Sequence, residues 1–73
     1  MLKIIDGVDL KELEKFYFKD CGSFYRKAWF VGDVADDYIC IDKETREISL
    51  YRGGYIEDLF DLFQAGLVEK VVD

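Results

Sequence analysis

The chain has 73 residues, which is enough for a single domain with one small hydrophobic core. Its net charge of −6 argues against non-specific binding to nucleic acids or anionic membranes, since both need a basic surface. It contains no histidine, so neither of its two cysteines has the usual base that would activate a nucleophile.

The first elements in chain order are a short strand and a helix. Leu2–Ile5 reads Leu-Lys-Ile-Ile and is followed by an Asp-Gly pair, which is typical of a strand that ends at a turn. Asp9 is predicted to cap a helix that ends near Tyr17, with Glu12 completing a capping box. The core face of this helix would carry Leu10, Leu13, Phe16 and Tyr17.

A long strand is predicted at Phe24–Val31, after a turn at Lys19–Ser23. Both faces of this strand are apolar near its C-terminal end, as expected of a central strand that is covered on both sides there. A loop at Gly32–Asp36 would lead into the next strand.

The strongest local signal is a β-hairpin within Asp37–Gly53. Two alternating runs flank Lys43–Arg46, which is predicted to be a four-residue connection around a type I turn. Pairing Ile41 with Ile48 sets a register that burial favours, because a shift of one residue would split the apolar set. That register places four residues on the core face: Ile39, Ile41, Ile48 and Leu50. The reverse face then carries Tyr38, Cys40, Ser49 and Tyr51.

Gly53 and Gly54 should break the sheet before a second helix over Tyr55–Ala65. Gly66 is predicted to end this helix in the left-handed conformation. The core face of the helix would carry Ile56, Leu59, Phe60 and Phe63. Val68–Val72 could form a strand beside Leu2–Ile5 or a frayed helical tail, and the clustered valines favour the strand.

Together these elements predict one α+β domain over residues 1–73. It would be a small antiparallel sheet, with a three-stranded meander plus short terminal strands, and two helices packed on one face. No helix remains to cover the opposite face. We therefore expect that face to contact a protein partner or a second copy of the chain. The expected contact residues are Tyr38 and Tyr51, joined by Tyr25 and Trp29 if strand pairing places them there.

No catalytic, cofactor-binding or metal motif stands out, so we expect a protein that is not an enzyme. Cys21 and Cys40 lack CxxC spacing, and the N-terminal residues do not resemble an export signal. We therefore expect a cytoplasmic protein with free thiols, while a disulfide between these two cysteines stays open as the alternative. No run is long enough to span a membrane.

Acidic residues offer an alternative function, an acidic nucleic-acid mimic that inhibits a host nuclease or regulator by occupying its basic groove. The residues that would do so are Asp33, Asp36, Asp37, Glu57, Asp58 and Asp61. Direct nucleic-acid binding is not expected, although Phe24–Phe30 mixes aromatic and basic residues as base-stacking strands do.

Two segments resemble small uncharacterised proteins encoded by bacterial phages and prophages. They are Ile41–Ile48, which reads Ile-Asp-Lys-Glu-Thr-Arg-Glu-Ile, and Ala65–Val71, which reads Ala-Gly-Leu-Val-Glu-Lys-Val. The resemblance covers residues 38–71, about half the chain, and carries over no activity or site residue. It implies a cytoplasmic accessory protein that works by protein–protein contact.

Overall fold

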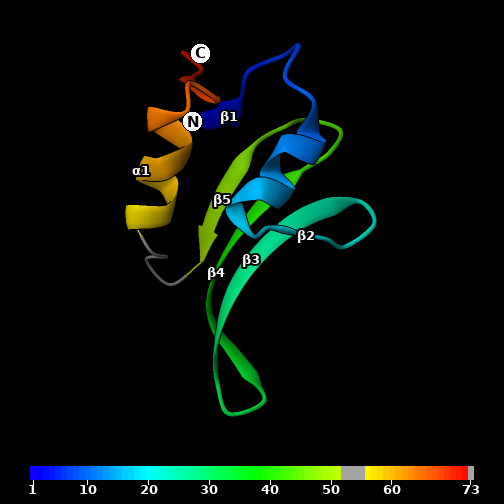
Figure 1. Cartoon of the computed structure of the whole chain (residues 1–73), viewed down its shortest axis with the longest axis vertical. Helices are drawn as coiled ribbons and strands as arrows, with labels where there is room; N and C mark the ends of the chain where they lie inside the picture. The colour runs from blue at the N-terminus through cyan, green and yellow to red at the C-terminus, as the bar shows by residue number, and fades with distance from the viewer. Residues whose placement is uncertain (52–55, 73) are drawn as a thin grey trace.

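The computed structural model describes residues 1–51 and 56–72, apart from the side chains of residues 31, 35, 36 and 56. The fold is of mixed α and β type with an antiparallel sheet, as predicted (Figure 1). In chain order the elements are β1 (Leu2–Ile4), the 3₁₀ helix η1 (Leu10–Phe16), β2 (Lys19–Asp20), β3 (Phe24–Val31), β4 (Val34–Asp42), β5 (Ile48–Tyr51), α1 (Ile56–Gln64) and β6 (Val68–Lys70).

The larger sheet has four strands in the order β2-β3-β4-β5, one more than the predicted meander. The predicted turn at Lys19–Ser23 is wrong in part, because β2 pairs with β3 before the chain turns. The predicted loop at Gly32–Asp36 is also wrong, because β4 begins at Val34. Gly32 has φ 64°, which suits a tight hairpin turn. The acidic residues that suggested a loop lie at this turn and at a bulge, where the register shifts between Trp29 and Phe30.

The hairpin of β4 and β5 has the predicted register. Ile41 lies opposite Ile48, and Ile39 lies opposite Leu50. Ile39 and Ile41 are fully buried, whereas Leu50 is 43% exposed, contrary to its predicted core position. The reason is that β5 is the edge strand, so Leu50 has a strand neighbour on one side only.

The hairpin turn joins the two sheets. The Asp42 N–H donates to the Glu47 carbonyl at 3.1 Å, which closes the predicted four-residue connection. The Arg46 carbonyl accepts from the Ile4 N–H at 2.9 Å, so the turn is bonded to β1. The Arg46 guanidinium donates to the carbonyls of Ile5 and Val8, at 3.0 and 2.8 Å.

The chain ends form the second sheet. β1 and β6 pair antiparallel, with Leu2 opposite Lys70 and Ile4 opposite Val68, which confirms the strand alternative for the C-terminal segment. This pair lies at one end of the molecule, and the β3–β4 turn lies at the other (Figure 1).

The first helix was expected to be an α-helix and is a 3₁₀ helix instead. The Asp9 side chain caps it by accepting from the Lys11 N–H at 3.0 Å, while Glu12 pairs with Lys15 and forms no capping box. With three residues per turn, one row of side chains faces the core: Leu10, Leu13 and Phe16. Tyr17 falls outside this row and is 83% exposed, contrary to prediction.

The end of η1 returns the chain to the core. Tyr17 adopts the left-handed conformation with φ 69°, and the Phe18 N–H donates to the Leu13 carbonyl at 3.2 Å. This is a Schellman-type end with a tyrosine where glycine is usual. Phe18, which the sequence did not place in the core, is 3% exposed.

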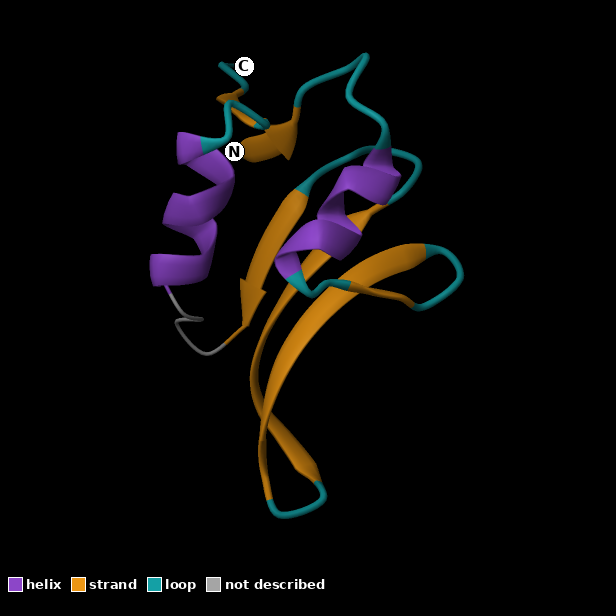
Figure 2. Ribbon diagram, in the orientation of Figure 1, coloured by secondary structure: helices purple, strands orange, loops and turns teal. Residues whose placement is uncertain are grey.

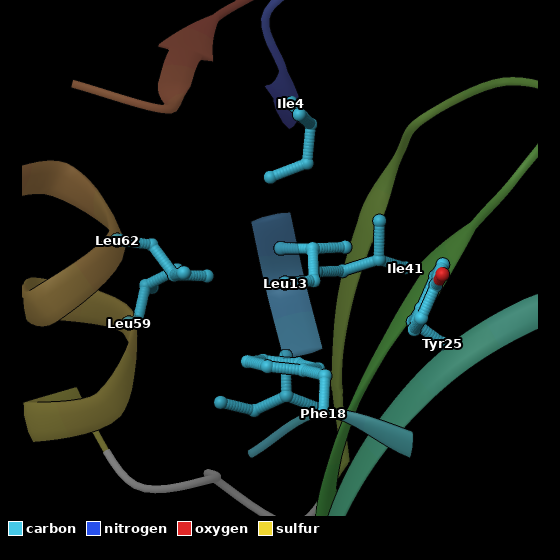
Figure 3. Close-up of a cluster of buried hydrophobic side chains, with 8 residues drawn as sticks. Ile4, Leu13, Phe18, Tyr25, Ile41, Leu59 and Leu62 are labelled. Atoms are coloured by element: carbon cyan, nitrogen blue, oxygen red, sulfur yellow. The ribbon is translucent and has the colours of Figure 1, made fainter. Parts of the chain in front are cut away.

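The second helix ends as predicted but faces the core differently. Gly66 has φ 74°, and the Leu67 N–H donates to the Leu62 carbonyl at 3.1 Å. Leu59 and Leu62 are buried, whereas Phe60 and Phe63 are exposed, so their predicted core positions are wrong. The α1 side chains that point into the core are shown in Figure 3. The predicted break at Gly53–Gly54, the helix start at Tyr55 and the side chain of Ile56 lie outside the described residues.

One hydrophobic cluster connects both sheets and both helices (Figure 3). Its buried members among the described residues are Ile4, Leu13, Phe18, Tyr25, Ile39, Ile41, Leu59 and Leu62. Since both helices contribute to the cluster that contains Ile39 and Ile41, both lie on the same side of the larger sheet (Figure 2).

Truncating a buried leucine on α1 should destabilise the protein, whereas truncating its exposed neighbour should not. We expect Leu62→Ala to lower the free energy of unfolding by about 2–5 kcal/mol, because it leaves a cavity in the cluster. The matched control Phe60→Ala should change it by less than about 0.5 kcal/mol. Urea unfolding of the three proteins measures this, and equal effects of the two substitutions would contradict the observed helix orientation.

Because of Asp42 in the hairpin turn, the stability of the fold should fall at acid pH. Its carboxylate accepts hydrogen bonds from the N–H groups of Thr45 and Glu44, at 2.9 and 2.8 Å, which hold the pKa of Asp42 below its ordinary value. A lowered folded-state pKa stabilises the fold above the unfolded-state pKa of about 3.9, and this stabilisation is lost as pH falls through the folded-state value.

In Asp42→Asn the amide oxygen can still accept both bonds, so we expect a folded protein whose stability falls less steeply in acid. Urea midpoints from neutral pH to about pH 2 measure the slope. The control is Asp33→Asn, because Asp33 is exposed and has no hydrogen bond to the described residues. An Asp42→Asn slope equal to that of the unmodified chain would refute the role of this carboxylate.

Candidate functional site

The face of the larger sheet that points away from the core carries a stacked pair of tyrosines. The rings of Tyr38 and Tyr51 lie 4.4 Å apart at an interplanar angle of 11°. The two residues are opposite each other on β4 and β5, and alternation puts them on the face opposite Ile39. The Arg26 guanidinium lies 5.8 Å from the Tyr38 ring centre. We call this surface the outer face; it also includes Ala28, Cys40 and Ser49.

Tyr25 and Trp29 do not join the outer face. Tyr25 lies opposite Ile41, so it shares the core face and is 3% exposed. Burial, reinforced by the nearby Glu14 carboxylate, raises the pKa of Tyr25. Trp29 is half-buried against the same cluster. Arg26 and Ala28 occupy the outer-face positions instead, because in the pairing with β4 the even-numbered residues of this part of β3 point outward.

The cysteines are both free. Cys40 is half-buried on the outer face, and this burial raises the pKa of its thiol, an effect that Arg26 opposes more weakly. A raised pKa keeps the thiol protonated near neutral pH, which disfavours nucleophilic chemistry. The Cys21 thiol contacts the Lys19 carbonyl at 3.6 Å.

The acidic residues considered for a mimic lie on two separate parts of the fold. Asp33 and Asp37 lie near the β3–β4 turn, far from α1 (Figure 1), and the side chain of Asp36 lies outside the described residues. On α1, Glu57 and Asp61 are exposed, but Asp58 forms an ion pair with Lys27 of β3. Among the described side chains no group of three carboxylates or thiols could hold a metal ion.

A basic hollow, which the sequence reasoning missed, lies beside β3. Its volume is about 340 Å³, and its lining among the described residues has three cationic side chains and no acidic one. Its lining residues are Tyr17, Lys19, Arg26, Lys27, Ala28 and Phe30. The only sequence signal for it is the excess of basic over acidic residues in segment 11–27 of an otherwise acidic chain.

The position of β2 beside this hollow is fixed by a contact with the hairpin turn. The Asp20 carboxylate accepts from the Lys43 ammonium group at 2.7 Å and from the Gly22 N–H at 2.9 Å. These bonds, the Lys43 bond first, hold the pKa of Asp20 below its ordinary value. The short strand β2 is thereby held against β3, and Lys19 with it.

Similarity to known proteins assigns no function to this chain, so its function has to be argued from its own residues. No helix in residues 1–51 and 56–72 is long and apolar enough to cross a membrane. The chain matches no protein-family model, no curated protein and no solved structure.

Proposed function

We propose that this chain is a non-enzymatic protein that acts by protein–protein contact through the outer face, with a second copy of the chain as its partner. The observation that carries the proposal is the stacked pair Tyr38–Tyr51 on a sheet face that neither described helix covers. Tyr51 is 48% exposed.

Tyrosine side chains suit such a contact for two reasons. The ring supplies a large apolar area and the hydroxyl a hydrogen bond, which is why tyrosine is enriched at protein interfaces. Stacking of Tyr38 on Tyr51 also fixes both rings before binding, so less side-chain entropy is lost on association.

The charge distribution favours the outer face over other surfaces for self-association. Two copies, each with net charge −6, repel each other when acidic surfaces meet. Arg26 lies beside the tyrosine pair and is a cation that can lie over an aromatic ring of the partner copy. Contact centred on the tyrosine pair therefore brings together aromatic and cationic groups.

The phage or prophage origin and the cytoplasmic location belong to the same proposal. They are supported by the resemblance of residues 41–48, which contain the β4–β5 turn, and of residues 65–71, which follow α1 and contain β6. The alternative of an acidic mimic has less support, because Asp58 is paired with Lys27 and the remaining acids are divided between two parts of the fold.

Replacing a tyrosine of the stack should disrupt self-association. We expect Tyr51→Glu to weaken the dimer by tenfold or more, because it breaks the stack and brings like charges together across the symmetric contact. Sedimentation velocity over a range of protein concentrations measures the dissociation constant. The matched control is Phe60→Glu, which adds the same charge at an exposed aromatic residue of α1 and should leave association unchanged.

Two results would refute the proposal. One is a strictly monomeric protein at all accessible concentrations. The other is a dimer that Phe60→Glu dissociates and Tyr51→Glu does not, since the contact would then lie on α1.

A further inference from the structure

The strand β3 has an open edge. β2 pairs with it only through Lys19 opposite Arg26 and Asp20 opposite Tyr25. β3 then continues to Val31, and beyond Arg26 no described strand lies on the β2 side of it. In Figure 1 this part of β3 runs with β4 away from the helices as a two-stranded ribbon.

The backbone groups that face this edge follow from the alternation of a strand. The Cys21 N–H donates to the Phe24 carbonyl at 2.8 Å, so the backbone of Phe24 points toward β2. In an antiparallel pair every second residue points its N–H and C=O to the same side. The N–H and C=O of Ala28 and Phe30 therefore point to the open edge, where no described backbone group pairs with them.

The basic hollow lies over the same edge. Three consecutive residues line it, Arg26, Lys27 and Ala28. Because consecutive side chains of a strand point to opposite faces, a hollow that all three line has to straddle the edge rather than lie on one face. Phe30, which is 58% exposed, extends the lining along the strand.

The cationic side chains at this edge favour a ligand that carries carboxylates. Lys19 and Arg26 form no ion pair with any described residue, whereas Lys27 is paired with Asp58. Lys19 and Arg26 lie opposite each other in the β2–β3 pair, so both side chains point to the same face of the sheet. An added strand with acidic residues at alternate positions would present its carboxylates on that face.

Tyr17 gives a further reason to assign a ligand to the hollow. It is a non-glycine residue in the left-handed conformation, with φ 69°, which is less favourable for tyrosine than for glycine. Its side chain is largely exposed and lines the hollow, and its ring centre lies 5.6 Å from the Lys27 ammonium group. A strained, exposed aromatic residue beside an open strand edge is the kind of outlier that points to function.

We propose that the open edge of β3 binds an extended acidic segment of a partner protein as an additional antiparallel strand. The partner backbone would bond to the N–H and C=O groups of Ala28 and Phe30, and its carboxylates would meet Lys19 and Arg26. This site shares Arg26 with the outer face but does not include the tyrosine pair. A second copy of β3 is a poorer occupant, because Phe24–Val31 contains no acidic residue.

The test is a titration of the whole protein with an acetylated and amidated peptide in which Glu and Val alternate over about eight residues. We expect the amide NMR signals of Ala28 and Phe30 to shift and their hydrogen exchange to slow on binding. Lys19→Glu should weaken binding by about tenfold or more, since it reverses a charge at the hollow. The matched charge reversal Lys70→Glu, on β6, should leave binding unchanged.

Two further probes separate strand addition from other modes of binding. A peptide with the same charges but methylated on alternate backbone amides cannot pair with the edge, so it should bind at least about tenfold more weakly. Equal binding of the methylated peptide would overturn strand addition. An oligothymidylate that binds at the hollow when the peptide does not would also overturn the proposal, since the site would then be one for nucleic acid.

The same titration is repeated with Tyr51→Glu, which should bind the peptide as the unmodified chain does. Loss of peptide binding in this variant would assign the peptide to the outer face and overturn the edge site. If the peptide binds Tyr51→Glu normally while the unmodified chain proves monomeric, the edge site stands and self-association through the outer face fails.

Discussion

The bonds that Arg46 makes join the parts of this fold that would be least stable alone. A two-stranded ribbon such as β1–β6 is marginal in water by itself. Here the Arg46 guanidinium donates hydrogen bonds to the carbonyls of Ile5 and Val8, and the Arg46 backbone carbonyl accepts one from the Ile4 N–H. Ile4 is thereby brought into the common cluster, and both helices are kept on one side of the larger sheet. The outer face of the larger sheet is exposed as a consequence of this arrangement.

The β4–β5 register could be derived from sequence because its parity is unambiguous. Only pairings of one parity place Ile39, Ile41 and Ile48 on the same face, and the observed pairing has that parity. β3 offers no such constraint, since apolar residues occur on both of its faces. The sequence therefore could not decide whether Tyr25 and Trp29 would lie inside or outside, and pairing with β4 placed them inside.

The face that each helix turns to the core was harder to predict from the sequence, for a related reason. The α1 sequence is apolar on two adjoining faces about 100° apart, so the pattern alone could not decide between a core face with Leu62 and one with Phe60 and Phe63. In η1 the tighter turn moved Tyr17 out of the apolar row. The basic hollow depends on where β2 stops pairing with β3, and a strand as short as Lys19–Asp20 has no periodicity that a sequence could display.

The pairing of β1 with β6 also constrains the order of folding. These strands are nearly the whole chain apart in sequence, so the loop that their contact closes is the longest in the protein. Contacts of this kind slow folding, because chain entropy is lost before they form. On the ribosome the β3–β4–β5 hairpins can pair while synthesis continues, and β1 can bond to the β4–β5 turn, but the β1–β6 pair forms only after Val68–Lys70 has emerged. Until then the side of β1 that pairs with β6 remains accessible to chaperones and proteases.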